Sequence, residues 1–234
     1  MPSPERKARE ETLVIPAGGV ELEGDLAIPD GARGLVLFAH GSGSSRKSSR
    51  NRFVAQALRK RQLGTLLFDL LTAAEERRDE VDAHLRFDIP LLASRLVEVT
   101  DRMRQSGPGK ELSIGYFGAS TGAAAALIAA AERPRDIGGV VSRGGRPDLA
   151  REALARVRAP TLLIVGGADT VVLDLNRQAL EAIQGPKQLV VVPGATHLFE
   201  EPGALDEVAR LAGDWFVEHL GSGSGSKRLQ MPAR

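Results

Sequence analysis

The sequence predicts a three-layer α/β fold, in which helices cover both faces of a mostly parallel, twisted sheet that begins with an antiparallel hairpin. Short continuous apolar runs, typical of strands buried on both faces, alternate along the chain with segments of helical periodicity. Near the N-terminus, instead, a run of alternating apolar and polar residues follows a Pro-Ala-Gly-Gly turn. With 234 residues, of which 42% are hydrophobic, the chain can bury one sizeable core, and we expect a single domain over residues 12–220.

The first elements follow from apolar runs and turn residues. Residues 12–15 and 20–27 flank the Pro-Ala-Gly-Gly turn, so they are expected to form a hairpin with one solvent-exposed face at an edge of the sheet. Continuous apolar runs over 34–39 and 64–69 predict internal strands. Between them, apolar side chains recur at helical spacing over 51–61, which predicts a helix.

The next stretch combines a polar segment with a helix. Residues 72–81 are rich in acids and bases, and we expect them to form a solvent-exposed loop. The following helix begins at Asp88, a capping residue, with Pro90 in its first turn. It is expected to run to about Arg104, before a Gly-Pro-Gly sequence ends it.

Strands and helices alternate through the second half of the chain, which is the pattern of a parallel sheet with crossover helices. Apolar runs predict further strands over 114–117, 137–142, 161–166 and 188–192. Helical spacing predicts helices from 121 to about 133 and over 148–157, 171–183 and 203–220.

The composition excludes several classes of partner. Lysine and arginine number 31 and aspartate and glutamate 30, giving a net charge of +1, and no long block carries a single sign. Nucleic acid or an anionic membrane would require a basic surface, so we expect a small-molecule partner instead. The absence of cysteine excludes disulfides, thiolate metal sites and a cysteine nucleophile. The four histidines do not cluster as metal ligands, so no metal site is expected.

Both ends of the chain are expected to lie outside the folded domain. Residues 1–11 are highly charged and lack the apolar region of a signal peptide, and no run of about 18 apolar residues could span a membrane. These features favour a soluble cytoplasmic protein. Residues 221–234 combine a Gly/Ser repeat with a short basic end, which is typical of a flexible linker and tail, a cloning remnant rather than a folded element.

A candidate nucleophile lies in the sequence Gly118-Ala119-Ser120-Thr121-Gly122. An apolar, strand-forming run enters this G-x-S-x-G pattern and an alanine-rich helical run leaves it, which is the context that a nucleophile elbow requires. The two glycines would allow the strand and the helix to approach closely. The alternative is a glycine-rich turn capped by a serine, so the interpretation depends on the partners of Ser120.

A serine hydroxyl attacks a carbonyl at neutral pH only with a base within hydrogen-bonding distance. In enzymes with such an elbow the chain order is Ser, Asp or Glu, His, and only His197 and His219 follow Ser120. His197 lies in the loop after the last predicted strand, at the same edge of the sheet as Ser120. His219 ends a helix, where it can act as a C-terminal cation. We therefore predict that His197 is the base.

The acid that orients this base should leave the preceding strand. Asp169 occupies that turn, although an aspartate there could also cap the following helix. Asp174 lies one turn into that helix, and Glu200 and Glu201 directly follow His197, so none of them has an equivalent position. We therefore predict that Asp169 is the acid.

The attack creates an oxyanion, which needs N–H donors from the residue after the nucleophile and from the loop after the third strand. Thr121 supplies the first donor. The loop that begins at His40 supplies the second, through Ser42 or, as the alternative, Gly43. A phosphate-binding loop is the competing interpretation, but neither G-x-x-x-x-G-K-[ST] nor G-x-G-x-x-G is present there.

His40 and Gly43 are also candidates for contact with the substrate, because their loop lies beside the expected cleft. The alternative for His40, as for His84, is a structural or surface role.

With the elbow, the acid turn, the histidine loop and the oxyanion loop in this order, the chain resembles the α/β-hydrolase superfamily over roughly residues 12–220. Its small size and the stretches 141–148 and 193–202 are similar to the dienelactone-hydrolase-like branch. This resemblance implies hydrolysis of small esters or lactones without a cofactor. True dienelactone hydrolases carry a cysteine where this chain has Ser120, so we expect a general serine carboxylesterase.

The resemblance also bears on the cleft and on other functions. Related enzymes often insert a lid between the strands that end near 142 and begin at 161, but residues 143–160 leave room for one helix only. We therefore expect no lid domain and a shallow, open cleft. A thioesterase or a serine peptidase would use the same triad, and a non-catalytic binding module could keep the same fold.

Five arginines leave the sheet at the edge that carries the candidate nucleophile. They are Arg46, Arg50 and Arg52 after the oxyanion loop, and Arg143 and Arg146 after a neighbouring strand. Such side chains are usually solvated and paired with local acids. The alternative is that one of them binds a substrate carboxylate, and Arg143, which leaves its strand first, is the best candidate.

Overall fold

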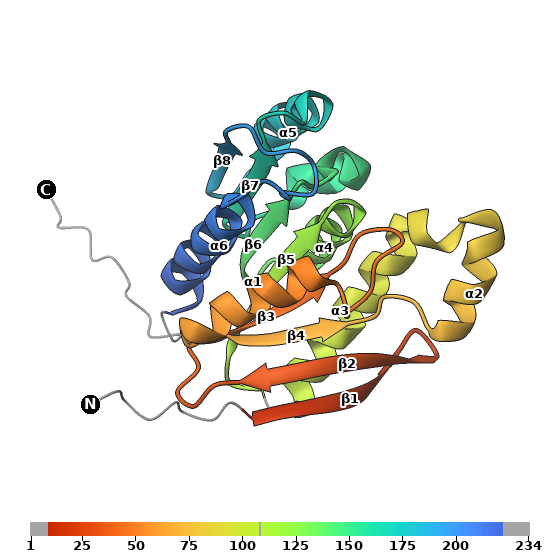
Figure 1. The fold of residues 1–234 in the computed structure, drawn as a ribbon. Helices are drawn as coiled ribbons and strands as arrows, with labels where there is room; N and C mark the ends of the chain where they lie inside the picture. The colour runs from red at the N-terminus through yellow and green to blue at the C-terminus, as the bar shows by residue number, and fades with distance from the viewer. Residues whose placement is uncertain (1–8, 108, 222–234) are drawn as a thin grey trace, which may run out of the picture.

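The computed structural model describes residues 9–107 and 109–221, in which eight strands form one sheet in the order β1-β2-β4-β3-β5-β6-β7-β8 (Figure 1). The strands are β1 (Arg9–Ala17), β2 (Val20–Ile28), β3 (Gly34–Ala39), β4 (Gly64–Phe68), β5 (Ser113–Ala119), β6 (Ile137–Arg143), β7 (Thr161–Gly166) and β8 (Lys187–Val192). The strands from β4 to β8 in this order are parallel, whereas β1 and β2 pair antiparallel, and β2 also pairs antiparallel with β4. The predicted parallel sheet with an antiparallel edge hairpin is thus confirmed.

Helices cover both faces of this sheet (Figure 1). One face carries α1 (Ser49–Lys60) and α6 (Ala204–Leu220). The other carries α3 (Ile89–Ser106), α4 (Thr121–Glu132), the 3-10 segment η2 (Pro147–Arg156) and α5 (Thr170–Ala182). Two shorter elements, α2 (Ala73–Asp82) and η1 (Leu85–Phe87), connect β4 to α3. Residues 1–8 and 222–234, which include most of the predicted N-terminal segment and tail, lie outside the described residues.

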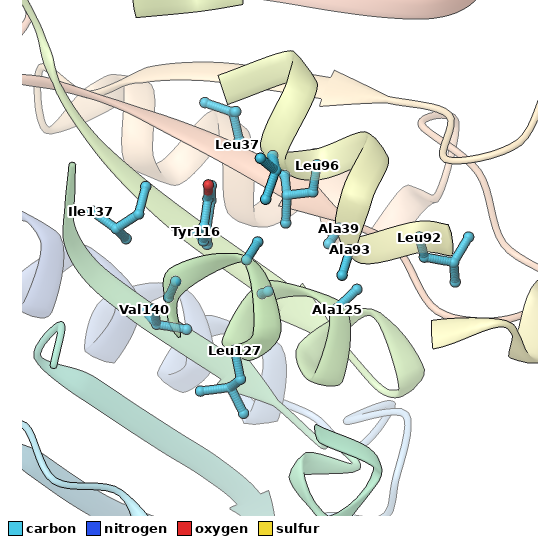
Figure 2. Packing of buried hydrophobic residues seen from close by; sticks show 14 of the residues in the cluster. Leu37, Ala39, Leu92, Ala93, Leu96, Tyr116, Ala125, Leu127, Ile137 and Val140 are labelled. Atoms are coloured by element: carbon cyan, nitrogen blue, oxygen red, sulfur yellow. The ribbon is translucent and has the colours of Figure 1, made fainter. Parts of the chain in front are cut away.

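A core of apolar side chains fixes α3 and α4 on their face of the sheet (Figure 2). Leu96 of α3 and Leu127 of α4 are both fully buried there. This core also contains a polar contact between Tyr116 of β5 and Thr100 of α3, whose hydroxyl oxygens lie 2.6 Å apart. Burial raises the pKa of this tyrosine, so it stays a neutral hydrogen-bonding group.

Strand β1 begins at Arg9, so residues 9–11, which were expected to lie outside the domain, belong to the sheet. Two further segments differ from the sequence-based expectation. The stretch 72–81 was expected to be a loop, but it forms helix α2. A capping box at Thr72 and Glu75 starts this helix, and Glu75 also forms an ion pair with the buried Arg95. The capping box is a local signal, Thr72-x-x-Glu75, that the sequence analysis missed, whereas the pair of Glu75 with Arg95 joins positions twenty residues apart.

The other difference lies in the segment between β6 and β7. The helix expected over 148–157 is 3-10 structure, interrupted at Arg151, where φ is 48° and ψ is −126°. The segment is short enough that no lid domain stands between the two strands, as expected. None of the described helices combines the length and the apolar composition needed to cross a membrane.

The turn from β5 into α4 brings backbone into close contact. A Cβ atom built on Gly122 would lie 2.2 Å from the carbonyl oxygen of Ala39 and 2.4 Å from that of His40. A Cβ on Gly118 would lie 2.4 Å from Cα of Ala123. Side chains at these two positions would therefore push α4 away from the strands.

We predict that Gly122→Ala lowers the free energy of unfolding by about 2 kcal/mol or more, since backbone atoms cannot yield as side chains do. Gly139→Ala in β6 is the matched control, because its Cβ would meet neighbours at 3.6 Å or more. Urea unfolding of both variants measures the difference. Equal midpoints for Gly122→Ala and the control would contradict the packing argument.

Candidate active site

Ser120 sits at the sharp turn between β5 and α4. Its φ of 51° and ψ of −122° are strained values for a residue with a side chain. Three backbone hydrogen bonds hold this conformation: the Ser120 N–H donates to the Arg143 carbonyl at 3.2 Å, and the Ser120 carbonyl accepts from the N–H groups of Ala123 at 3.1 Å and Arg146 at 3.0 Å. The elbow geometry predicted from the G-x-S-x-G pattern is therefore present.

His197 and Asp169 form a direct pair, with Nδ1 of the histidine 2.7 Å from Oδ2 of the aspartate. Asp169 occupies the N-cap position of α5, but its side chain makes no capping hydrogen bond. Its carboxylate is thus directed to the histidine and not to the helix. A neutral imidazole that donates from Nδ1 keeps Nε2 unprotonated and able to accept a proton. The His197 side chain is 38% exposed, so solutes can reach it.

Backbone hydrogen bonds tie the loops that carry this pair. The Ala168 N–H donates to the Ala195 carbonyl, and the Gly167 N–H donates to the Val192 carbonyl, both at 2.9 Å. A Cβ on Gly166 would lie 2.3 Å from the Ala195 carbonyl oxygen, so this close approach requires glycine. The geometry of the pair therefore depends on backbone contacts between the exits of β7 and β8.

The competing acids have other partners. Asp174 pairs with Arg177 at 2.9 Å, and Glu200 with Arg50 at 3.3 Å. Hydrogen bonds from Thr196 hold the pKa of Glu201 below its usual range.

The competing histidine is likewise engaged elsewhere. His219 packs edge-on against Trp215, with ring centroids 4.4 Å apart, on helix α6.

His197 lies over the exit of β6, next to the elbow. A Cβ on Gly144 would lie 3.0 Å from the His197 carbonyl oxygen and 3.6 Å from its Cε1 atom. Gly144 directly follows Arg143, the residue that accepts the hydrogen bond from Ser120. Among the described residues, no hydrogen bond joins the Ser120 hydroxyl to the His197 ring.

The predicted oxyanion donors contact one another. Thr121 is the first residue of α4, so its N–H has no partner within the helix. The Ser42 N–H, however, donates to Oγ1 of Thr121 at 2.8 Å. Gly43, the alternative donor, has a φ of 68° and open space where a Cβ would be.

His40 has both ring nitrogens engaged by the backbone. Nδ1 lies 3.0 Å from the Gly41 carbonyl, and Nε2 accepts a hydrogen bond from the Leu70 N–H at 3.0 Å. Burial lowers the pKa of this imidazole, which keeps it neutral. The arrangement favours the structural alternative for His40, since no polar atom of its ring is left for a substrate.

A hollow of about 390 Å³ lies beside the oxyanion loop. It is lined by residues 40–45 of that loop, by Leu71 and Leu92, and by Glu76 and Glu80 of α2. This volume falls within the range of small-molecule sites. Gly43 lines this hollow, whereas Ser120 and His197 do not, so the hollow adjoins the candidate site on the side of the oxyanion loop.

Four of the five arginines at this edge pair with acids. Arg46 pairs with Asp69, Glu23 and Asp25, Arg50 with Glu200, Arg52 with Asp25, and Arg146 with Asp148. For these side chains the ordinary, paired role applies.

Arg143 differs from the other four arginines. It is only 6% exposed, its side chain forms no ion pair with any described residue, and the only hydrogen bond of its guanidinium to these residues goes to Oδ1 of Asn51 at 3.3 Å. Its guanidinium lies 5.9 Å from the ring centroid of Phe199. Burial and the nearby charge of Arg50 lower the pKa of Arg143 to about 10, so the side chain remains charged at neutral pH.

One contact of the site was missed in the sequence. Asp69, directly after β4, accepts a hydrogen bond from the Arg46 N–H at 2.7 Å and pairs with the Arg46 side chain. It thereby fixes the far end of the oxyanion loop. Its position at the carboxyl end of a strand is the signal that could have identified it. Among the described residues there is no group of three or more His, Asp or Glu side chains that could hold a metal.

The chain is similar in sequence to part of a longer, named protein. The sequence matches no model of a known protein family. It is 58% identical over 213 residues to a protein of Mycobacterium tuberculosis named a putative phosphoribosyl transferase. The match covers 91% of this chain but only 47% of that protein, so the chain spans less than half the length of this relative.

Solved structures give a more extensive match. Est1E from Butyrivibrio proteoclasticus shares the fold with a TM-score of 0.75 at 16% identity, covering 90% of this chain and 99% of that one. A dienelactone hydrolase from Anabaena variabilis is 58% identical, with a TM-score of 0.90, and the match covers 92% of this chain and 99% of that one. Because this identity extends over nearly the whole of a solved relative, the chain belongs to the dienelactone hydrolase family of the α/β-hydrolase fold.

Proposed function

We propose that the protein is a serine carboxylesterase that hydrolyses small esters or lactones through an acyl-enzyme on Ser120. The observation that carries this proposal is the His197–Asp169 pair, at 2.7 Å, beside a serine held in a strained elbow. An aspartate in a capping position that leaves its helix uncapped and contacts a histidine instead is explained by catalysis and not by helix stability.

In the first half of the reaction the Ser120 hydroxyl attacks the ester carbonyl carbon while Nε2 of His197 accepts its proton. Asp169 orients the imidazole and stabilises its charged form. The tetrahedral intermediate then expels the alcohol, which takes the proton from His197, and an acyl-serine remains. Water, deprotonated by His197, releases the acid and restores Ser120.

The absence of a hydrogen bond between Ser120 and His197 is compatible with this scheme, because such contacts are often long without substrate and shorten in the Michaelis complex. The two residues leave adjoining parts of the sheet edge, since Gly144 lies against His197 and follows the carbonyl that binds the Ser120 N–H.

The surroundings of the site favour small substrates. Only the short segment η2 stands between β6 and β7, so no lid domain is inserted between these two strands. The hollow beside the oxyanion loop, about 390 Å³, has room for a short acyl or alcohol group. We infer that short-chain esters and lactones are the substrates, and that the enzyme needs no cofactor.

The buried charge of Arg143 supports a more specific substrate. A guanidinium this deeply buried is costly without a compensating anion, and the four neighbouring arginines all have one. Arg143 leaves β6 next to the elbow and packs against Phe199, two residues after His197. We therefore propose that a carboxylate of the substrate pairs with Arg143.

Three other functions are alternatives: two of them would use the same triad, and the third would need no catalytic residue. A thioesterase or serine peptidase would share the triad, and a panel of oxygen esters, thioesters and peptides separates these activities. A non-catalytic module would not react with a serine-directed fluorophosphonate, whereas an esterase would be labelled at Ser120.

We predict that Ser120→Ala and His197→Ala each lower kcat by about 10³-fold or more, because each removes a chemical role. Both variants should fold as the wild type does. Hydrolysis of p-nitrophenyl acetate measures the loss, with Ser142→Ala and His219→Ala as matched controls that retain activity. Ester hydrolysis by Ser120→Ala within a few-fold of wild type would exclude this serine as the nucleophile.

Asp169→Asn should lower kcat by up to about 10⁴-fold, since the amide favours the wrong histidine tautomer while keeping the shape of the side chain. Asp174→Asn, an exposed acid paired with Arg177, is the control. Steady-state kinetics on the same ester compare the two. An inactive Asp174→Asn variant together with a normally active Asp169→Asn variant would show that Asp174 is the acid that orients His197.

Arg143→Met removes the charge but keeps much of the side-chain volume. We predict that it raises KM for an ester with a free carboxylate by on the order of 10-fold relative to a neutral analogue, as expected for a loss of about 1.4 kcal/mol of charge-assisted binding. Arg146→Met, whose parent side chain pairs with Asp148, is the control. Equal changes in KM for the charged and the neutral ester would indicate that Arg143 has a structural role only.

A further inference from the structure

We propose that the side-chain hydroxyl of Thr121 donates a hydrogen bond to the oxyanion of the tetrahedral intermediate, together with the N–H of the same residue. In this arrangement the Ser42 N–H does not contact the oxyanion. It binds and orients Thr121 Oγ1 instead. The inference rests on the proposed esterase function and adds a catalytic group to it.

The first observation is that the expected loop donor is already occupied. The Ser42 N–H donates to Thr121 Oγ1 at 2.8 Å, which is the length of a good hydrogen bond. A backbone N–H carries one hydrogen, so it cannot make a second bond of equal quality. The hydroxyl oxygen therefore lies where an oxyanion bound to Ser42 would have to lie.

The second observation is that the Thr121 hydroxyl keeps its own proton available. A threonine oxygen can accept two hydrogen bonds and donate one. Among the described residues, Oγ1 of Thr121 accepts from Ser42 and makes no donation. Accepting a hydrogen bond polarises the O–H group and strengthens the bond that it can donate.

The third observation is the place of Thr121 in the fold. The residue follows Ser120 directly and opens α4, so its N–H has no helical partner and lies at the positive end of the helix dipole. Within one residue, the N–H and the Oγ–H are three bonds apart and can bind a single oxygen together. Thr121 is only 5% exposed, which limits competition from water.

The loop that carries Ser42 is held from both ends. Nε2 of His40 accepts the Leu70 N–H at one end, and Arg46 is bound by Asp69 at the other. Residues 69 and 70 directly follow β4, so the loop is fixed to the sheet itself. Ser42 is therefore a positioning residue whose N–H stays directed at Thr121.

The competing explanation is that Thr121 Oγ1 merely occupies the oxyanion site until the substrate displaces it. The two explanations predict opposite effects of Thr121→Val, which keeps the branched shape and removes the hydroxyl. If the hydroxyl is a donor, its loss slows the reaction. If it only fills the site, its loss frees the Ser42 N–H and the reaction is equally fast or faster.

The test measures kcat and KM of wild type, Thr121→Val, Thr121→Ala and Thr121→Ser on one short-chain p-nitrophenyl ester. We expect the valine and alanine variants to lose about 10²-fold in kcat, the loss typical of one oxyanion donor, with KM little changed. The serine variant keeps the hydroxyl and should stay within a few-fold of wild type. The affinity for a trifluoromethyl ketone, which forms an oxyanion on Ser120, should fall in parallel with kcat.

Valine and alanine variants that both retain wild-type kcat would overturn the inference about Thr121 and leave the esterase proposal intact. A serine variant as slow as the valine variant would also overturn it, since packing and not the hydroxyl would then be responsible. If wild type hydrolyses no ester and Ser120 resists a fluorophosphonate, the proposed function itself fails, and the inference with it.

Discussion

The candidate site depends on the close approach of α4 to β3 and β5, which only residues without a side chain permit. With Cβ positions 2.2 Å and 2.4 Å from neighbouring carbonyl oxygens, Gly122 has no tolerated replacement that keeps this distance. The approach sets the strained backbone of Ser120 and brings the first turn of α4 against the loop after β3. One steric constraint therefore places the candidate nucleophile and the helix dipole, and it also brings the candidate oxyanion donors together.

Electrostatics separates the residues that hold this arrangement from those that can act on a ligand. Arg46 illustrates the first group, because its charge is balanced by Asp69 and by two further acids, and its effect is to fix a loop. Arg143 illustrates the second, since it is charged, buried and without an acid. His40 and His197 differ in the same way: both ring nitrogens of His40 bind backbone, whereas His197 has one partner and one free nitrogen.

The sequence was informative where a pattern is local. Alternating apolar runs predicted the sheet, and chain order together with the shared carboxyl edge of parallel strands singled out Asp169 and His197, which the structure brings within 2.7 Å of one another. It was not informative where contacts join distant segments. The ion pair of helix α2 with Arg95 lies twenty residues beyond Glu75 and has no local pattern, although the capping box Thr72-x-x-Glu75 was a local signal of this helix that we missed. The bond from Ser42 to Thr121 spans 79 residues, and no local pattern encodes it.

The order of the strands in the sheet also determines which part of the candidate site unfolds first on heating. Asp169 and His197 leave β7 and β8, and β8 is an outermost strand with solvent-exposed residues and a single neighbouring strand. Outer strands open locally with smaller free energies than central ones. Ser120, by contrast, leaves β5, which lies between β3 and β6 in the interior of the sheet. We therefore expect fraying of the sheet edge to separate His197 from Ser120 while the rest of the fold is still intact. On heating, the proposed esterase activity would then be lost below the temperature at which the whole domain unfolds.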